Sequence, residues 1–154
     1  MTATIRHLLP ATLALSLMLG GCASTSSSVS VDELTRHTWS LASATDADGK
    51  PDTALTGGDK APIALSFHPD RIGISNACNG MGGDYQVEDD TLKVGNLMQT
   101  MMACEPVLMA REDAIKKRLQ QPLRMEIDEN TSQLLMRNEA GVMVFKPNSE
   151  QADR

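Results

Sequence analysis

Residues 63–75 read IALSFHPDRIGIS, and this stretch decides the fold class of the chain. Apolar residues alternate with small or polar residues on both sides of a His-Pro-Asp turn. A period of two is typical of a strand with one buried face, and a short break between two such runs predicts a β-hairpin. We therefore expect antiparallel β structure to dominate.

The same alternation recurs along the rest of the chain. Turn-forming residues such as Asp48-Gly49 separate the runs, and their close spacing favours hairpins. We expect about eight strands, and those beyond the first hairpin lie at residues 39–44, 84–88, 92–94, 123–127, 133–138 and 142–146.

One segment has helical periodicity instead. Pro106 suits a first helical turn, and Leu108, Ile115 and Leu119 lie along one stripe of a helix over residues 107–121. An antiparallel sheet can bury one face against such a helix. The expected fold class is α+β, mainly β: a curved antiparallel sheet or partial barrel with one helix packed against it.

The N-terminus is typical of a bacterial lipoprotein signal peptide. Arg6 precedes an apolar run at residues 8–19, and Leu19-Gly20-Gly21-Cys22 follows. The run is shorter than the roughly 18 residues of a spanning helix, and small residues before a cysteine resemble the lipobox. We expect residues 1–21 to be removed and Cys22 to carry the lipid.

The residues after this cysteine predict where the protein is held. Ala23 and Ser24 lack the aspartate that commonly retains lipoproteins in the inner membrane. We therefore expect an outer-membrane lipid anchor with the domain facing the periplasm. Small polar residues form a flexible tether at 22–33. One globular domain follows at 34–147, and a polar tail at 148–154.

The two remaining cysteines, Cys78 and Cys104, allow a single intramolecular pairing. In an oxidising periplasm we expect them to form a disulfide. It would close a loop of about 27 residues and contribute roughly 3–4 kcal/mol. A zinc site is disfavoured because neither cysteine belongs to a C-x-x-C pair and only His37 and His68 remain. We expect no metal and no cofactor.

The charge balance disfavours nucleic acid as a partner. The formal net charge is −6, and the single basic cluster is Lys116-Lys117-Arg118. We interpret this cluster as the solvated face of the predicted helix.

Catalytic patterns are incomplete. Residues 73–77 read GISNA, which imitates the G-x-S-x-G nucleophile elbow but ends in Ala77 and precedes no predicted helix. A small periplasmic hydrolase using Ser75 with His68 is one alternative function, and a periplasmic protease inhibitor is another, suggested by a small stapled β domain. We assign no catalytic residue.

Methionines gather around Cys104, at positions 98, 101, 102 and 109. Thioethers can hold Cu(I), so Met98, Met101 and Met102 are candidate copper ligands. Methionine also fills gaps in a core, and this chain has few aromatic residues. We favour core packing for this cluster.

Three motifs occur in order along the chain: Trp39-x-Leu41, Cys78-Asn79-x-x-x-Gly83-x-Tyr85, and Thr100-x-Met102-Ala103-Cys104 followed by Glu112. In this order they resemble the META domain family, the HslJ-like bacterial lipoproteins. The resemblance covers residues 34–147. Ala77 departs from the family pattern, which usually has Gly before the first cysteine.

The resemblance implies a small mixed β domain with a helix, and links to heat shock, envelope stress and, for some members, antibiotic tolerance. It implies no established catalytic activity. The motif residues given structural roles, besides the two cysteines, are Trp39, Asn79, Gly83, Tyr85, Thr100 and Met102. We expect a lipid-anchored binding or envelope-maintenance module, with the membrane as one partner through Cys22 and an envelope protein as another.

Overall fold

The computed structural model describes residues 28–57 and 59–148. The strands in these ranges are β1 (Thr38–Thr45), β2 (Ala64–Phe67), β3 (Arg71–Ser75), β4 (Met81–Glu88), β5 (Thr91–Val94), β6 (Met98–Gln99), β7 (Leu123–Asp128), β8 (Gln133–Asn138) and β9 (Gly141–Asn148). The helices are α1 (Val31–Thr35), α2 (Thr53–Thr56) and α3 (Pro106–Leu119).

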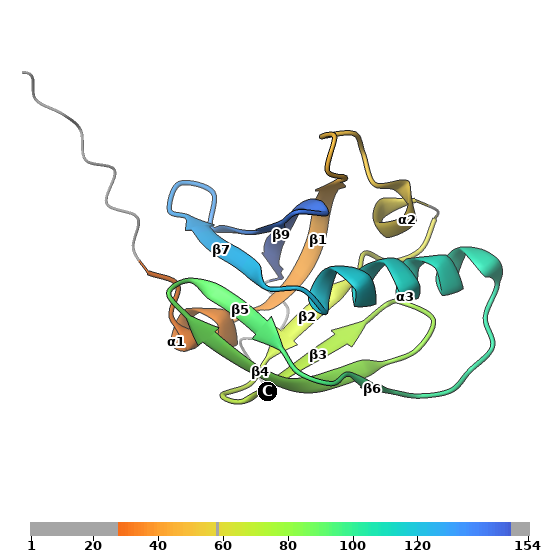
Figure 1. Ribbon diagram of the computed structural model, residues 1–154, viewed down its shortest axis with the longest axis horizontal. Helices are drawn as coiled ribbons and strands as arrows, with labels where there is room; N and C mark the ends of the chain where they lie inside the picture. The colour runs from red at the N-terminus through yellow and green to blue at the C-terminus, as the bar shows by residue number, and fades with distance from the viewer. Residues whose placement is uncertain (1–27, 58, 149–154) are drawn as a thin grey trace, which may run out of the picture.

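The strands form a closed antiparallel barrel (Figure 1). The strand order is β3-β2-β1-β9-β8-β7-β5-β4, and β4 pairs back with β3 to close the ring. All eight predicted strands are present, and β6 is an additional two-residue strand paired with β4. The mainly β, antiparallel prediction is therefore confirmed, and the partial barrel is in fact closed.

The barrel interior is the hydrophobic core. Alternate residues of each long strand point inward, as the period of two predicted. The most deeply buried strand side chains include Leu65, Ile72, Leu92, Leu123, Leu134, Met136, Met143 and Phe145. Near Leu41 the register of β1 against β9 shifts, so Ala42 is the extra residue of a bulge.

The predicted long helix is α3, and its two halves differ. Ile115 and Leu119 in its C-terminal half are fully buried, whereas Val107 and Met109 in its first turns are exposed. Figure 1 shows the N-terminal end of α3 and the preceding loop extending beyond the strands. The first turn of the helix is therefore exposed, and the helix is buried on one side from Arg111 onward.

The basic residues of α3 do not all face solvent, which corrects our interpretation of the cluster at 116–118. Lys117 is exposed, but Arg118 is buried, and so is Arg111 two turns earlier. These two positions are seven residues apart, so they lie on the same side of the helix as part of its apolar stripe.

Packed structure begins before Leu34, within the segment that we assigned to the tether. Val29 is buried, and Ser30 caps α1 through a reciprocal capping box with Glu33. The predicted signal peptide, Cys22 and residues 149–154 lie outside the described residues. In the ranges that are described, no helix is long and apolar enough to cross a membrane.

Candidate functional site: a methionine-rich loop held by a disulfide

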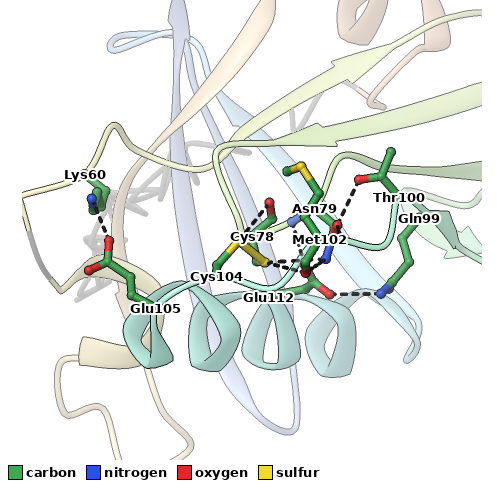
Figure 2. Close-up of a disulfide and its surroundings, with 9 residues drawn as sticks. All are labelled: Lys60, Cys78, Asn79, Gln99, Thr100, Met102, Cys104, Glu105 and Glu112. Carbon is green, nitrogen blue, oxygen red and sulfur yellow. Dashed lines mark hydrogen bonds and ion pairs between the residues drawn. A yellow bond between two sulfur atoms is a disulfide. The ribbon is translucent and has the colours of Figure 1, made fainter.

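The predicted disulfide is formed between Cys78 and Cys104, with a Cα–Cα distance of 5.7 Å. Cys78 follows β3, and Cys104 lies two residues before α3. The bond therefore fixes the loop that leads from β6 into α3 against the turn between β3 and β4 (Figure 2).

Asn79 holds the same loop through its side-chain amide. Its Oδ1 accepts hydrogen bonds from Thr100 Oγ1 at 2.9 Å and from Met102 N at 2.7 Å. Its Nδ2 donates to Met102 O at 3.4 Å. The buried amide thus pairs with both backbone polar groups of Met102, much as a neighbouring strand would. This contact joins Asn79 to Thr100 through its side chain and to Met102 through its backbone alone.

Glu112 ties the loop to α3. The carboxylate is buried, and its Oε2 accepts from Asn79 N at 2.7 Å while Oε1 accepts from Gln99 Nε2 at 3.0 Å. Lys116, one turn later, donates to Gln99 Oε1 at 2.7 Å. Glu112 was part of the sequence motif, but its spacing gave no sign that it would be buried between the two cysteine segments.

The other motif residues lie elsewhere in the barrel. A Cβ at Gly83 would lie 2.7 Å from Asn96 O, so this close backbone approach requires glycine. Tyr85 Oη donates to His68 O at 2.8 Å, and burial, with Asp70 nearby, raises the pKa of its phenol. Trp39 Nε1 donates to Leu34 O at 2.9 Å and so fixes α1. These three residues have structural positions.

The loop held in this way turns its apolar side chains outward. Met98 is 68 % exposed, Met101 96 % and Met102 59 %, and Val107 and Met109 on α3 are also exposed. Our preference for core packing of these methionines is therefore wrong. The backbone of β6 pairs with β4, and the backbone N–H of Met102 donates to Asn79. The methionine side chains face solvent. We call Met98, Met101, Met102, Val107 and Met109 the methionine surface.

The segment that carries this surface has little charge of its own. The stretch from residue 98 to 110 contains one ionisable side chain besides the disulfide cysteines, Glu105, whose Oε1 lies 2.6 Å from Lys60 Nζ (Figure 2). Exposed apolar side chains that gather in one segment of a chain make that segment a candidate site of interaction with other molecules.

A family model described as "META domain" matches residues 32–150. The chain belongs to the META domain family. The sequence resemblance is thus confirmed, and the disulfide, Asn79 and Glu112 are where this META domain joins its two cysteine segments.

Solved structures have the same fold. A protein from Burkholderia xenovorans, solved by NMR, superposes with a TM-score of 0.61 at 21% identity, over 88% of this chain and 100% of that one. A second NMR structure gives a TM-score of 0.59 at 26% identity, over 77% of this chain and 95% of that one. No curated protein matches this META domain significantly.

Ser75 and His68, the two residues of the hydrolase alternative, lie far apart in the structure. In the β2–β3 hairpin, Ser75 lies opposite Ala64, whereas His68 follows Phe67 at the turn. At about 3.3 Å per residue, the two side chains are separated by roughly 10 Å or more. His68 therefore cannot act as a base for Ser75 in this META domain.

In the part of the chain that is described, no group of three or more His, Cys, Asp or Glu side chains is placed to hold a metal ion such as zinc. The two histidines considered for zinc differ in their contacts. His37 packs edge-on against Trp39, with 5.6 Å between the ring centroids. The backbone carbonyl of His68 accepts the hydrogen bond from the Tyr85 hydroxyl.

Proposed function

We propose that this META domain is a lipid-anchored binding module of the periplasm, held at the outer membrane through Cys22. It acts by binding rather than by catalysis, and it docks an apolar segment of an envelope protein on the methionine surface. This role agrees with the links to envelope stress and antibiotic tolerance that the family resemblance implies.

The observation that carries the proposal is the combination of exposure and restraint at the methionine surface. Methionine side chains are unbranched and polarisable, so they adapt to differently shaped apolar partners. The disulfide, Asn79 and Glu112 hold the backbone beneath them. Because less backbone entropy is lost on docking, a loop restrained in this way binds more tightly than a free one.

The position of the surface suits a protein held by its N-terminus. Figure 1 shows α1, where the chain enters the domain, at one end of the long axis, and the loop before α3 at the other end. A short tether from Cys22 to Val29 would leave the methionine surface directed away from the anchor. A protein partner therefore fits this geometry better than the bilayer that holds the lipid.

Site-specific crosslinking in cells tests this function. A photoreactive residue at Met101 should capture one envelope protein, whereas the same residue at Ala47, in an exposed turn elsewhere, should not. The purified pair should then bind saturably, and Met101→Gln with Met102→Gln should weaken binding at least tenfold. Capture of the same species from both positions, or unchanged binding by the double variant, would contradict the proposal.

A second candidate function is Cu(I) binding by the same thioethers. The observation in its favour is that three thioethers, those of Met98, Met101 and Met102, lie within five residues of sequence and are exposed instead of packed in the core. Replacing Met101 and Met102 by leucine separates the two functions, because leucine keeps the apolar surface and removes the sulfur. Copper binding should be lost in that variant while protein docking persists. A titration in which the wild type takes up no Cu(I) ends this candidate.

A further inference from the structure

Two arginines are buried on the same side of α3, and their partners differ. Arg118 Nη2 donates to Asp52 Oδ2 at 2.9 Å and to Thr45 O at 2.6 Å. Arg111 donates only to backbone carbonyls: Nη1 to Ala61 O at 2.9 Å and Asn76 O at 3.2 Å, and Nη2 to Gly57 O at 2.7 Å.

The charge of Arg111 is therefore not matched. Within residues 28–57 and 59–148, no carboxylate forms an ion pair with it, and its Nε has no hydrogen-bond partner. Arg118 also has one unpartnered nitrogen, Nη1, but Asp52 neutralises its charge. Carbonyl groups satisfy the hydrogen bonds of a guanidinium, but a buried cation without a counter-ion still favours any anion that can approach it.

A cavity adjoins Arg111 and is open to such an anion. It has a volume of about 160 Å³. Lys60, whose Nζ also pairs with Glu105 Oε1 at 2.6 Å, adds a second cation, and Thr56 adds a hydroxyl group. The apolar part of the wall consists of Leu41, Leu55 and Pro62. Ala42, the bulge residue of β1, lies on its exposed side. Strand bulges commonly re-aim side chains beside binding sites.

We propose that this cavity binds a small organic carboxylate that carries a short apolar group. The carboxylate lies beside Arg111, where it supplies the missing negative charge, and within reach of Lys60, which also pairs with Glu105. The apolar group contacts Leu41, Leu55 and Pro62. A cavity of this volume has room for a ligand of about six heavy atoms. The cavity contains no residue of the methionine surface, so this proposal rests on different residues from the proposed docking function.

An NMR titration of the full chain with sodium butanoate tests the proposal, with butanamide as the uncharged probe of matched shape. The backbone amides of Ala42, Thr56 and Lys60 should shift saturably with butanoate, and much less with butanamide. Absence of saturable shifts with butanoate, or equal affinity for the two probes, would overturn the assignment of a carboxylate site.

Variants at the exposed side of the cavity separate binding from folding. Ala42→Phe should fill the cavity and abolish butanoate binding, whereas Ala47→Phe, the same change in an exposed turn, should leave it unchanged. Lys60→Gln should weaken binding about two- to fivefold, as expected for a half-exposed cation. Butanoate binding that survives Ala42→Phe would refute the location.

Removal of the buried charge is the most direct variant. Arg111→Met keeps the length of the side chain and should weaken butanoate binding more than tenfold. If this variant does not fold, the Ala42 and Lys60 variants still decide the question, because neither alters a buried side chain.

Discussion

The eight methionines that the structure describes divide into two equal sets. Four lie in the barrel interior, at positions 81, 125, 136 and 143, and four lie on the surface around the disulfide, at positions 98, 101, 102 and 109. The side chain is the same in both sets, so its hydrophobicity does not decide its place. Strand alternation directs the first set inward. The second set lies in the two-residue strand β6 (Met98), in the loop after it (Met101 and Met102) and in the first turns of α3 (Met109).

This contrast teaches that a hydrophobic residue outside the long strands cannot be assigned to the core by composition. In a strand, the backbone hydrogen bonds lie in the sheet, and side chains alternate between its two faces. In the loop after β6, the backbone of Met102 is instead satisfied by one buried side chain, Asn79. The same thioether therefore stabilises the fold at Met136 and is free for binding at Met101.

The largest expected effect on stability comes from replacing a methionine of the interior set. Met136→Ala should reduce the free energy of unfolding by roughly 2–5 kcal/mol, because it leaves a cavity in a closed barrel. Met101→Ala is the matched control, and we expect a change within about 0.5 kcal/mol. Urea unfolding of the two variants measures the difference. Equal destabilisation would refute the division into two sets.

Removing the disulfide tests the restraint on the surface set. Replacing Cys78 and Cys104 by alanine should cost about 3 kcal/mol, as expected for a loop closed over a separation of 26 residues. Amide exchange should accelerate most between β6 and α3. Reduction of the wild type with dithiothreitol should lower its unfolding midpoint, and an unmoved midpoint would show that the bond contributes little.

Asn79→Ala should weaken the same restraint while the disulfide remains. The backbone N–H of Met102 and the hydroxyl of Thr100 lose their acceptor, at an expected cost of about 1–3 kcal/mol. Thr100→Val removes one of these contacts and should cost less. If Thr100→Val proves as damaging as Asn79→Ala, the amide is not the centre of this contact.

A smaller effect concerns the interior at alkaline pH. The pKa of Tyr85 is raised in the folded protein by burial and by Asp70, so its contribution to stability is complete below the unfolded pKa of about 10. Stability should then fall as the pH rises through the folded pKa, because the unfolded chain releases this proton first. Tyr85→Phe should flatten the alkaline limb of a plot of unfolding midpoint against pH. An unchanged limb would refute this linkage.

The sequence predicted those features that repeat locally. Alternation located eight strands, and the stripe of Ile115 and Leu119 located the long helix. Closure of the barrel was not predictable in this way, since it depends on strand pairs that are distant in sequence, β1 with β9 and β5 with β7. The two-residue strand β6 is too short to show a period.

The candidate sites were predicted less completely than the fold. Cysteine count was enough for the disulfide, and motif resemblance selected Asn79 and Thr100. The burial of Arg111 and Glu112 could not be predicted, because charged residues on a helix are ordinarily solvated and only tertiary contacts show otherwise. The exposure of the methionines at 98, 101, 102 and 109 could not be predicted for the same reason, since only the tertiary structure shows which side chains lie on the surface.

The pairing of β1 with β9 has a consequence for how the chain folds. These strands lie at opposite ends of the domain sequence, yet they are neighbours in the ring, with Thr38 opposite Asn148. Pairs so distant in sequence raise the contact order and slow folding. The ring cannot close until the last strand has been synthesised, so a growing chain that lacks β9 would expose unpaired strand edges and remain a substrate for chaperones.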